Sequence, residues 1–136
     1  MIETNALLNA LEDGLISDAI IDVWENEPDI NLTLLNRVFL GTPHIAGYSA
    51  DGKANATRMS LDALCRFFHI KADYRIVPPQ PRNPIITADS LAEAYLQMYD
   101  PRRDSETLKT HPEQFEKLRG DYPLRREKDA YTYIPK

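Results

Sequence analysis

The sequence predicts an α/β protein whose first part contributes parallel strands and helices and whose last part is a small α+β module. Two observations support this fold class. Short apolar runs of strand length alternate with helical patterns over residues 1–48, which is typical of parallel sheets covered by helices. Four prolines within the eight residues 77–84 then interrupt all regular structure. The alternating part is too short for a complete sheet, and 136 residues suffice for one ordinary domain or two small lobes.

The first predicted element is a helix near the N-terminus. Apolar residues recur at helical spacing over residues 6–11. Thr4 or Asn5 is expected to cap its start, and Gly14 is expected to end it.

Two short strands and one helical turn follow. Residues 19–24 form an apolar run of the kind that a parallel sheet buries on both faces. Residues 32–35 predict a single helical turn, and residues 38–41 predict a second strand that ends at Thr42 and Pro43.

The longest predicted helix spans about residues 49–68. Its apolar residues, among them Met59, Ala63 and Phe67, recur at helical spacing, while most of its charged residues lie elsewhere. Ser49 or Asp51 is expected to cap it. The proline-rich segment that follows is the linker candidate.

The remaining residues predict a strand at 85–87, helices at 91–98 and 111–120, and a terminal strand at 131–134. A module of this size buries little apolar surface alone, so it is expected to lean on a neighbour.

The composition excludes several classes of function. Sixteen basic and twenty-one acidic side chains give a net charge of −5, and no basic block is present to bind nucleic acid. Cys65 is the only cysteine, so neither an intrachain disulfide nor a thiolate metal site is expected. No apolar run reaches the length of a membrane span, and residues 1–4 do not open a signal peptide. A cytoplasmic protein without metal, nucleic acid or membrane partners is expected.

His44 is the residue that points most directly to chemistry. It follows the second predicted strand, and Asp22 and Glu27 lie at the end of the first. Ligands bind at the carboxyl ends of strands in open α/β sheets. A histidine there can exchange a proton near neutral pH, and a nearby carboxylate can orient it. The alternative is a turn histidine that bonds the backbone.

Each of the other candidate residues also has a structural alternative. Asp22 either holds a polar group of a ligand or accepts a bond from a nearby backbone N–H. Glu27 either orients the imidazole or is a solvated loop acid. Gly47 either lets a ligand approach closely or permits a turn with positive φ, and Tyr48 either contacts substrate or packs.

The two blocks Ile21-Asp22-Val23-Trp24-x-x-Glu27-Pro28 and Thr42-Pro43-His44-Ile45-Ala46-Gly47, in this order, resemble the D-2-hydroxyacid dehydrogenases. Three later blocks narrow the resemblance to a branch of that family with a C-terminal dimerisation domain. They are Gly47-Tyr48-x-x-x-Gly52-Lys53-Ala54, Tyr99-Asp100-x-x-Arg103-Asp104 and Phe115-x-x-Leu118-Arg119-x-x-Tyr122-x-x-Arg125-Arg126-Glu127. The resemblance implies a Rossmann-like fold for the first part of the chain. It assigns residues 1–48 to the C-terminal part of an NAD-binding lobe, 49–76 to an interlobe helix and the linker start, 77–84 to the linker, and 85–136 to the dimerisation domain.

The resemblance also implies roles for single residues. His44 matches the general acid/base and Glu27 the carboxylate that hydrogen-bonds it, while Asp22 and Gly47 match NAD contacts and Tyr48 a substrate contact. The implied protein is a homodimeric, NAD-dependent oxidoreductase acting on a small phosphorylated 2-hydroxy acid.

This chain holds only part of what such a reaction needs. Its five glycines include no Gly-x-Gly-x-x-Gly fingerprint for a dinucleotide, and the family's substrate-binding arginine is expected in a block upstream of residue 2. We therefore expect the chain alone to lack dehydrogenase activity. Two other interpretations remain, a non-catalytic dimerisation module and a part of a dehydrogenase for another 2-hydroxy acid.

Overall fold

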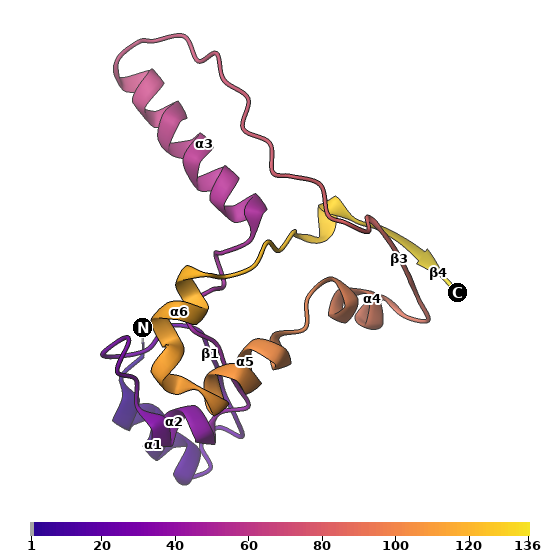
Figure 1. Ribbon diagram of the computed structural model, residues 1–136. Coiled ribbons are helices and arrows are strands. Elements are labelled where there is room, and N and C mark those ends of the chain that lie inside the picture. The colour runs from indigo at the N-terminus through magenta and orange to yellow at the C-terminus, as the bar shows by residue number, and fades with distance from the viewer. Residues whose placement is uncertain (1) are drawn as a thin grey trace. The chain divides into compact units, whose positions relative to one another are not determined.

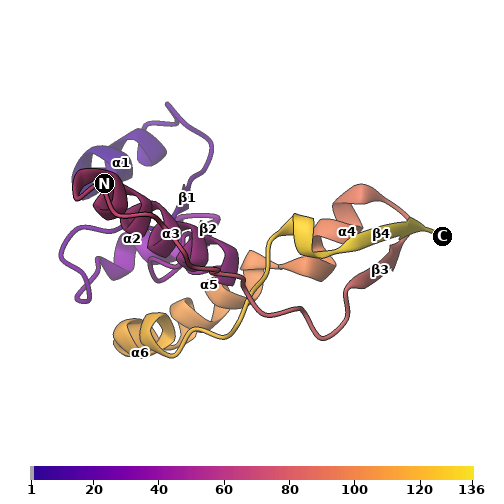
Figure 2. The same cartoon turned by 90° about the horizontal axis from the view of Figure 1, so that it is seen from above.

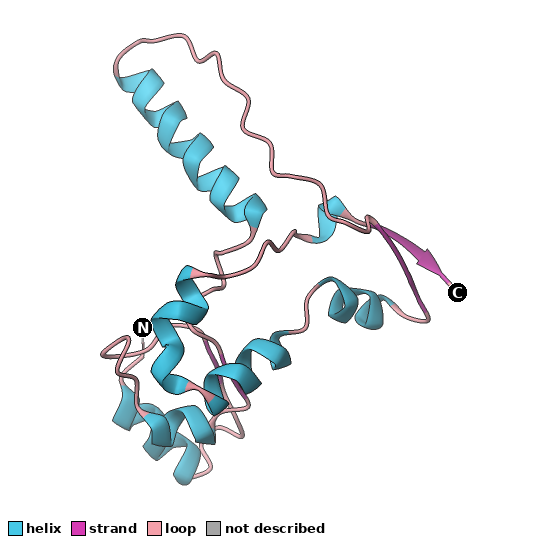
Figure 3. Cartoon of the chain, viewed as in Figure 1, coloured by secondary structure: helices cyan, strands magenta, loops and turns pink. Residues whose placement is uncertain are grey.

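The computed structural model describes residues 2–136, whose contacts group into two compact units (Figure 1). Unit 1 comprises Met1–Ala46 and Asp100–Pro123, and unit 2 comprises Gly47–Tyr99 and Leu124–Lys136. Helices predominate, and the strands are short (Figure 3). The mixed helix and strand content confirms the predicted α/β class.

Unit 1 is built around a pair of parallel strands. Strand β1 pairs with β2, with Ile20 opposite Leu40 and Ile21 opposite Gly41. The helices of the unit gather around these strands in both views (Figures 1 and 2). The elements are α1 (Thr4–Glu12), β1 (Ile20–Ile21), α2 (Leu32–Arg37), β2 (Leu40–Gly41), α5 (Pro101–Thr110), a 3₁₀ turn (Pro112–Gln114) and α6 (Phe115–Gly120).

Helix α1 is capped by Glu3, which lies one residue before Thr4 and two before Asn5, the two predicted caps. The Glu3 carboxylate, rather than a Thr4 or Asn5 side chain, accepts hydrogen bonds from the N–H groups of Asn5 and Ala6. A carboxylate can satisfy two of the unpaired N–H groups at a helix start, which the shorter side chains cannot do as readily. Gly14 follows the end of the helix with φ of 69°, as predicted.

The first strand is shorter than the predicted run of residues 19–24. Only Ile20 and Ile21 pair with the neighbouring strand. The Trp24 N–H instead donates to the Glu27 carboxylate at 2.8 Å, so local side-chain bonds replace the ladder beyond residue 21.

The core of unit 1 joins two segments that are distant in the sequence. Phe115 and Leu108, from the second segment, are fully buried with residues of the first. Residues 85–136 were predicted to form one module. In the structure, residues 100–123 pack with the N-terminal segment instead, because burying these two apolar side chains stabilises the fold. The buried cluster consists of Leu7, Leu11, Ile21, Trp24, Ile30, Leu34, Leu35, Val38, Leu108 and Phe115.

Helix α5 was not predicted, and it covers the free edge of β2. Its Ser105 hydroxyl accepts the Gly41 N–H at 3.0 Å, and the Lys109 ammonium donates to the Val38 carbonyl at 2.7 Å. These bonds satisfy backbone groups that an uncovered edge strand leaves open. Asp100 caps the helix and Pro101 occupies its first turn, a pattern typical of helix starts that the sequence does contain.

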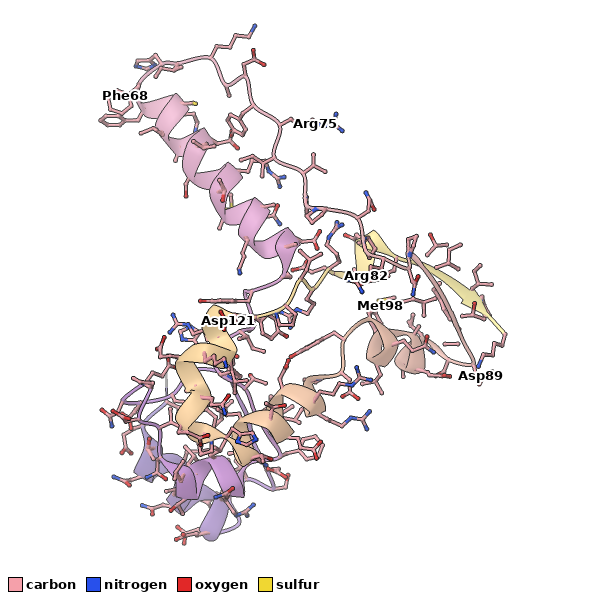
Figure 4. The ribbon with its side chains drawn as sticks, in the orientation of Figure 1. Phe68, Arg75, Arg82, Asp89, Met98 and Asp121 are labelled. Atoms are coloured by element: carbon pink, nitrogen blue, oxygen red, sulfur yellow. The ribbon has the colours of Figure 1, made fainter. Side chains whose placement is uncertain are left out.

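Unit 2 contains a second pair of parallel strands and the longest helix. Strand β3 pairs with β4, and α4 packs on them through a small cluster around Ile86, Ala88 and Ala94. Of the two predicted caps of α3, Ser49 is the one used. Figure 4 labels Phe68 just after this helix and Arg75 on the extended stretch that follows. The elements are α3 (Ala50–Phe67), β3 (Ile85–Ala88), α4 (Leu91–Met98), a 3₁₀ turn (Lys128–Ala130) and β4 (Thr132–Pro135).

The start of α3 is held by the C-terminal segment. The Arg126 guanidinium donates two hydrogen bonds to the Asp51 carboxylate, at 2.8 and 2.9 Å, and also bonds the Pro79 carbonyl. The Glu127 N–H donates to the same carboxylate at 2.8 Å. The Arg126 guanidinium lowers the pKa of the Asp51 carboxyl. No residue of α3 is buried, so polar bonds attach it: these bonds at its start, and the bonds of the Tyr74 hydroxyl to the Arg58 carbonyl and the Asp62 carboxylate.

We expect Gly41→Ala to lower the free energy of unfolding by about 1–3 kcal/mol, because a side chain there overpacks the core. A Cβ at Gly41 would lie 2.8 Å from the Trp24 ring and 2.9 Å from a Leu35 methyl group. Urea denaturation followed by tryptophan fluorescence measures the change. Gly120→Ala is the matched control, since a Cβ there meets nothing within 4 Å and should be neutral or slightly stabilising. Equal stability of the two variants would contradict the expected clash.

We expect Asp51→Asn to destabilise unit 2 near neutral pH by about 1–3 kcal/mol. Because the pKa of Asp51 is lowered from its ordinary value of 3.8 in the folded protein, its contribution is full above that value. The contribution is lost as the pH falls through the lower folded value. Denaturation followed by circular dichroism at a series of pH values should show wild type and variant converging in acid. Asp73→Asn, on the exposed extended stretch, is the control. A difference that stays constant into acid would argue against the ion pair.

Candidate active site

The predicted site residues of unit 1 lie at one edge of the β1–β2 pair. Because the two strands are parallel, the residues that follow them emerge at the same edge. Asp22 follows β1 directly, and the loop that carries His44 follows β2. The structure therefore brings together His44, Glu27 and Asp22.

Asp22 organises the loop that carries the histidine. One carboxylate oxygen accepts the Thr42 hydroxyl and the Ile45 N–H, both at 2.7 Å, and the other accepts the Ala46 N–H at 3.0 Å. The bond to backbone N–H groups is the structural alternative given for Asp22 above. These bonds stabilise His44 with φ of 55°, a left-handed conformation that costs energy for a residue with a Cβ atom.

Glu27 makes a direct hydrogen bond to His44. The imidazole Nδ1 lies 2.9 Å from Glu27 Oε2, and Glu27 Oε1 accepts the Trp24 N–H at 2.8 Å. An ionised carboxylate only accepts, so Nδ1 carries the proton and Nε2 of the neutral ring is left as an acceptor. The Glu27 side chain is 16% exposed and that of His44 is 40% exposed, so the imidazole is accessible while the carboxylate that it contacts is shielded.

The indole of Trp24 supports the same loop from the core. Its Nε1–H donates to the Thr42 carbonyl at 2.9 Å, and Trp24 is 4% exposed. The apolar core of unit 1 is thereby linked to the backbone two residues before His44.

Arg119 lies close to Glu27, a contact that the spacing of the sequence could not predict. Its Nη1 lies 3.8 Å from Glu27 Oε2 and 3.7 Å from Glu116 Oε1. It belongs to α6, which reaches Glu27 only through tertiary packing. Arg119 belongs to one of the sequence blocks that resemble the family, but no local pattern indicates that it lies near Glu27.

Gly47 and Tyr48, the two other predicted site residues, belong to unit 2. Gly47 does not have a positive φ, and a Cβ at this position would meet nothing within 4 Å. Among the alternatives given above, the positive-φ turn is therefore not observed. The ring of Tyr48 lies under the Lys53 ammonium, 4.4 Å from ring centroid to nitrogen, a cation–π contact.

The donor set fits the reacting end of a nicotinamide cofactor, since a shielded carboxylate and an open imidazole stand where parallel strands end. The glycine cradle for a pyrophosphate is not among the five glycines of the chain. Within residues 2–136, no group of three or more histidine, cysteine, aspartate or glutamate side chains is placed to hold a metal ion. In the same range, no helix is both long and apolar enough to cross a membrane.

Comparisons with known proteins cover both ends of the chain. Residues 1–46 match the family described as D-isomer specific 2-hydroxyacid dehydrogenase, NAD binding domain, and residues 81–135 match a domain of unknown function (DUF3410). The chain is 67% identical over 134 residues to an erythronate-4-phosphate dehydrogenase of Bacteroides fragilis and 66% identical to that of Bacteroides thetaiotaomicron, in each case over 98% of its length. The enzyme of Porphyromonas gingivalis is 40% identical over 97% of the chain. In each case the chain spans 38% of the relative's length.

We expect Asp22→Asn to loosen the His44 loop. An asparagine has one acceptor oxygen, so its NH₂ group would face the Ala46 N–H and that donor would lose its bond to a charged acceptor. Hydrogen exchange of the Ile45 and Ala46 amides should accelerate by roughly tenfold or more, corresponding to a loss of about 1–3 kcal/mol. Asp18→Asn is the matched control.

The control is informative because both bonds of Asp18, from the N–H groups of Ala19 and Phe39, go to a single oxygen that asparagine retains. Unchanged protection of Ile45 and Ala46 in Asp22→Asn would show that these bonds do not hold the loop.

Proposed function

We propose that this chain, which resembles the C-terminal region of erythronate-4-phosphate dehydrogenases over nearly its whole length, is part of an NAD-dependent oxidoreductase with that activity. The reaction is oxidation of 4-phospho-D-erythronate to 2-oxo-3-hydroxy-4-phosphobutanoate, a step of pyridoxal phosphate biosynthesis. The hydrogen bond between Glu27 and His44, at the carboxyl edge of a parallel strand pair, is the observation that supports catalysis most strongly.

His44 is the general base of this reaction. Its Nε2 takes the proton of the substrate C2 hydroxyl as the C2–O bond becomes a carbonyl. NAD, when bound, supplies the acceptor for the hydride that leaves C2. Nδ1–H stays bonded to Glu27, and the carboxylate stabilises the imidazolium that forms. In the reverse direction, the same Nε2 returns its proton to the carbonyl oxygen.

The other predicted residues have binding roles in this proposal. Asp22 and Gly47 contact NAD, and the Tyr48 hydroxyl contacts the substrate. Asp22 retains free acceptor capacity beside its loop bonds, since a carboxylate has about four acceptor sites and three are used. The chain alone, without a glycine fingerprint, is expected to be inactive.

The dehydrogenase is proposed to be a cytoplasmic homodimer that associates through residues 85–136. Several large apolar side chains of β3, α4 and β4 are exposed, which supports an association surface in unit 2. These side chains are Ile85, Leu91, Tyr95, Leu96 and Ile134. A non-catalytic dimerisation module is the second candidate function, and the same exposed side chains favour it.

The test of the proposal is a pair of substitutions in the dehydrogenase that contains this chain, assayed with 4-phosphoerythronate and NAD. We expect His44→Asn to lower kcat by roughly 10²–10⁴-fold, because proton transfer by a positioned base supplies about that much. Glu27→Gln should lower kcat by roughly 10²-fold or more, because an amide does not stabilise the imidazolium.

His69→Asn is the matched control. His69 also has a left-handed φ, of 54°, and asparagine tolerates that conformation, so the backbone effect is the same at both histidines. Normal kcat in His44→Asn, or an equal loss in His69→Asn, would refute the assignment of His44. Absence of turnover in the unsubstituted protein would favour the dimerisation module.

A further inference from the structure

We propose that Arg119 is a positioning residue of the site, which holds the Glu27 carboxylate in the orientation that fixes His44. The inference rests on the proposed function for its catalytic consequence, and on the geometry of unit 1 for its structural part. It gives the C-terminal segment a part in the reaction as well as in association.

The two carboxylate oxygens of Glu27 bond different partners. Oε1 accepts the Trp24 N–H at 2.8 Å, and Oε2 accepts His44 Nδ1–H at 2.9 Å. A carboxylate oxygen has two acceptor sites, so Oε2 retains one for a second cation. Arg119 Nη1 lies 3.8 Å from Oε2, which is ion-pair range but longer than a direct hydrogen bond. The guanidinium therefore attracts the carboxylate without displacing the imidazole.

The pair formed by Glu27 and Arg119 is partly shielded from solvent. Glu27 is 16% exposed and Arg119 is 31% exposed, so the attraction is screened less than at an open surface. A guanidinium keeps its charge throughout the pH range in which an imidazole titrates. Arg119 consequently restrains Glu27 whether or not His44 holds a second proton, and that constancy suits a group that must stay in place during proton transfer.

Arg119 is carried by a helix that is packed against the core of unit 1. On α6, Phe115 is fully buried and Leu118 packs against the same core, so the helix is fixed on the side next to Arg119. Just after the helix, the Tyr122 hydroxyl donates to Asp104 of α5 at 2.8 Å. Figure 4 labels Asp121 at this end of α6. A side chain on a packed element restrains a partner better than one on a loop.

The alternative role of Arg119 is to bind an anionic group of the substrate. The two roles have different kinetic signatures. An arginine that binds substrate contributes mainly to KM, whereas one that holds Glu27 contributes to kcat and only while Glu27 is ionised.

The kinetic test is a double-mutant cycle in the dehydrogenase that contains this chain. We expect Arg119→Gln to lower kcat roughly 3- to 30-fold, the range of ordinary coupling between contacting residues, with KM within about twofold of wild type. Arg119→Lys should recover most of the loss because it keeps the charge. In a Glu27→Gln background, Arg119→Gln should have no further effect on kcat. Glu116→Gln, which removes a second carboxylate near Arg119, should leave kcat unchanged.

A second readout does not depend on activity and uses the 136-residue chain. The Trp24 amide donates to Glu27, so its hydrogen exchange reports on the placement of that carboxylate. We expect Arg119→Gln to accelerate Trp24 exchange at least threefold while Ile45, whose amide bonds Asp22, is unchanged.

The outcomes separate the inference from the proposed function. Unchanged Trp24 exchange, equal acceleration at Ile45, or a rise in KM at constant kcat each overturns the positioning role. Accelerated Trp24 exchange in a protein without dehydrogenase activity supports the positioning of Glu27 and overturns only the proposed reaction.

Discussion

The geometry of the candidate site depends on the parallel pairing of two strands that are each two residues long. Because Ile20 and Ile21 run alongside Leu40 and Gly41 in the same direction, the residues that follow both strands leave at one edge. Asp22 then spans the gap with three hydrogen bonds to the loop of the second strand. An antiparallel pair would have sent the two chain segments to opposite ends, and the His44 imidazole would not have met the Asp22 and Glu27 carboxylates.

So short a strand pair needs support from outside it. Helix α5 provides that support on the free edge of β2, where the Ser105 hydroxyl and the Lys109 ammonium bond the backbone. Phe115 and Leu108 complete the apolar core, which the first 46 residues would otherwise leave open. The segment that matches a domain of unknown function thus contributes both core and edge cover to unit 1. Interaction of the two segments, rather than either alone, stabilises the site.

Local sequence signals predicted much of this arrangement. The helix at residues 49–68 and the strand and helix at 85–98 are confirmed, because amphipathic spacing and a serine cap act within a few residues. The direction of β1 and β2 followed from the α/β pattern, and with it the shared edge of Asp22 and His44. The predicted length of β1 was wrong, because the Trp24 N–H donates to the Glu27 side chain instead of to a neighbouring strand.

What the sequence could not predict is set by tertiary packing. Helix α5 has low apolar content and was missed, although Asp100 and Pro101 mark its start. The distance between Glu27 and His44 depends on a loop conformation with positive φ. The approach of Arg119 to Glu27 depends on where α6 packs, which no local pattern encodes.

The central claim is that Glu27 holds His44 as the tautomer with a free Nε2, and ¹⁵N NMR of the His44 imidazole at neutral pH tests it most directly. The account predicts that, in the neutral ring, Nδ1 carries the proton and Nε2 shows the shift of an unprotonated nitrogen. A neutral ring protonated at Nε2 would contradict it, because Nδ1 could then not donate to Glu27 and Nε2 could not accept the proton of a substrate hydroxyl.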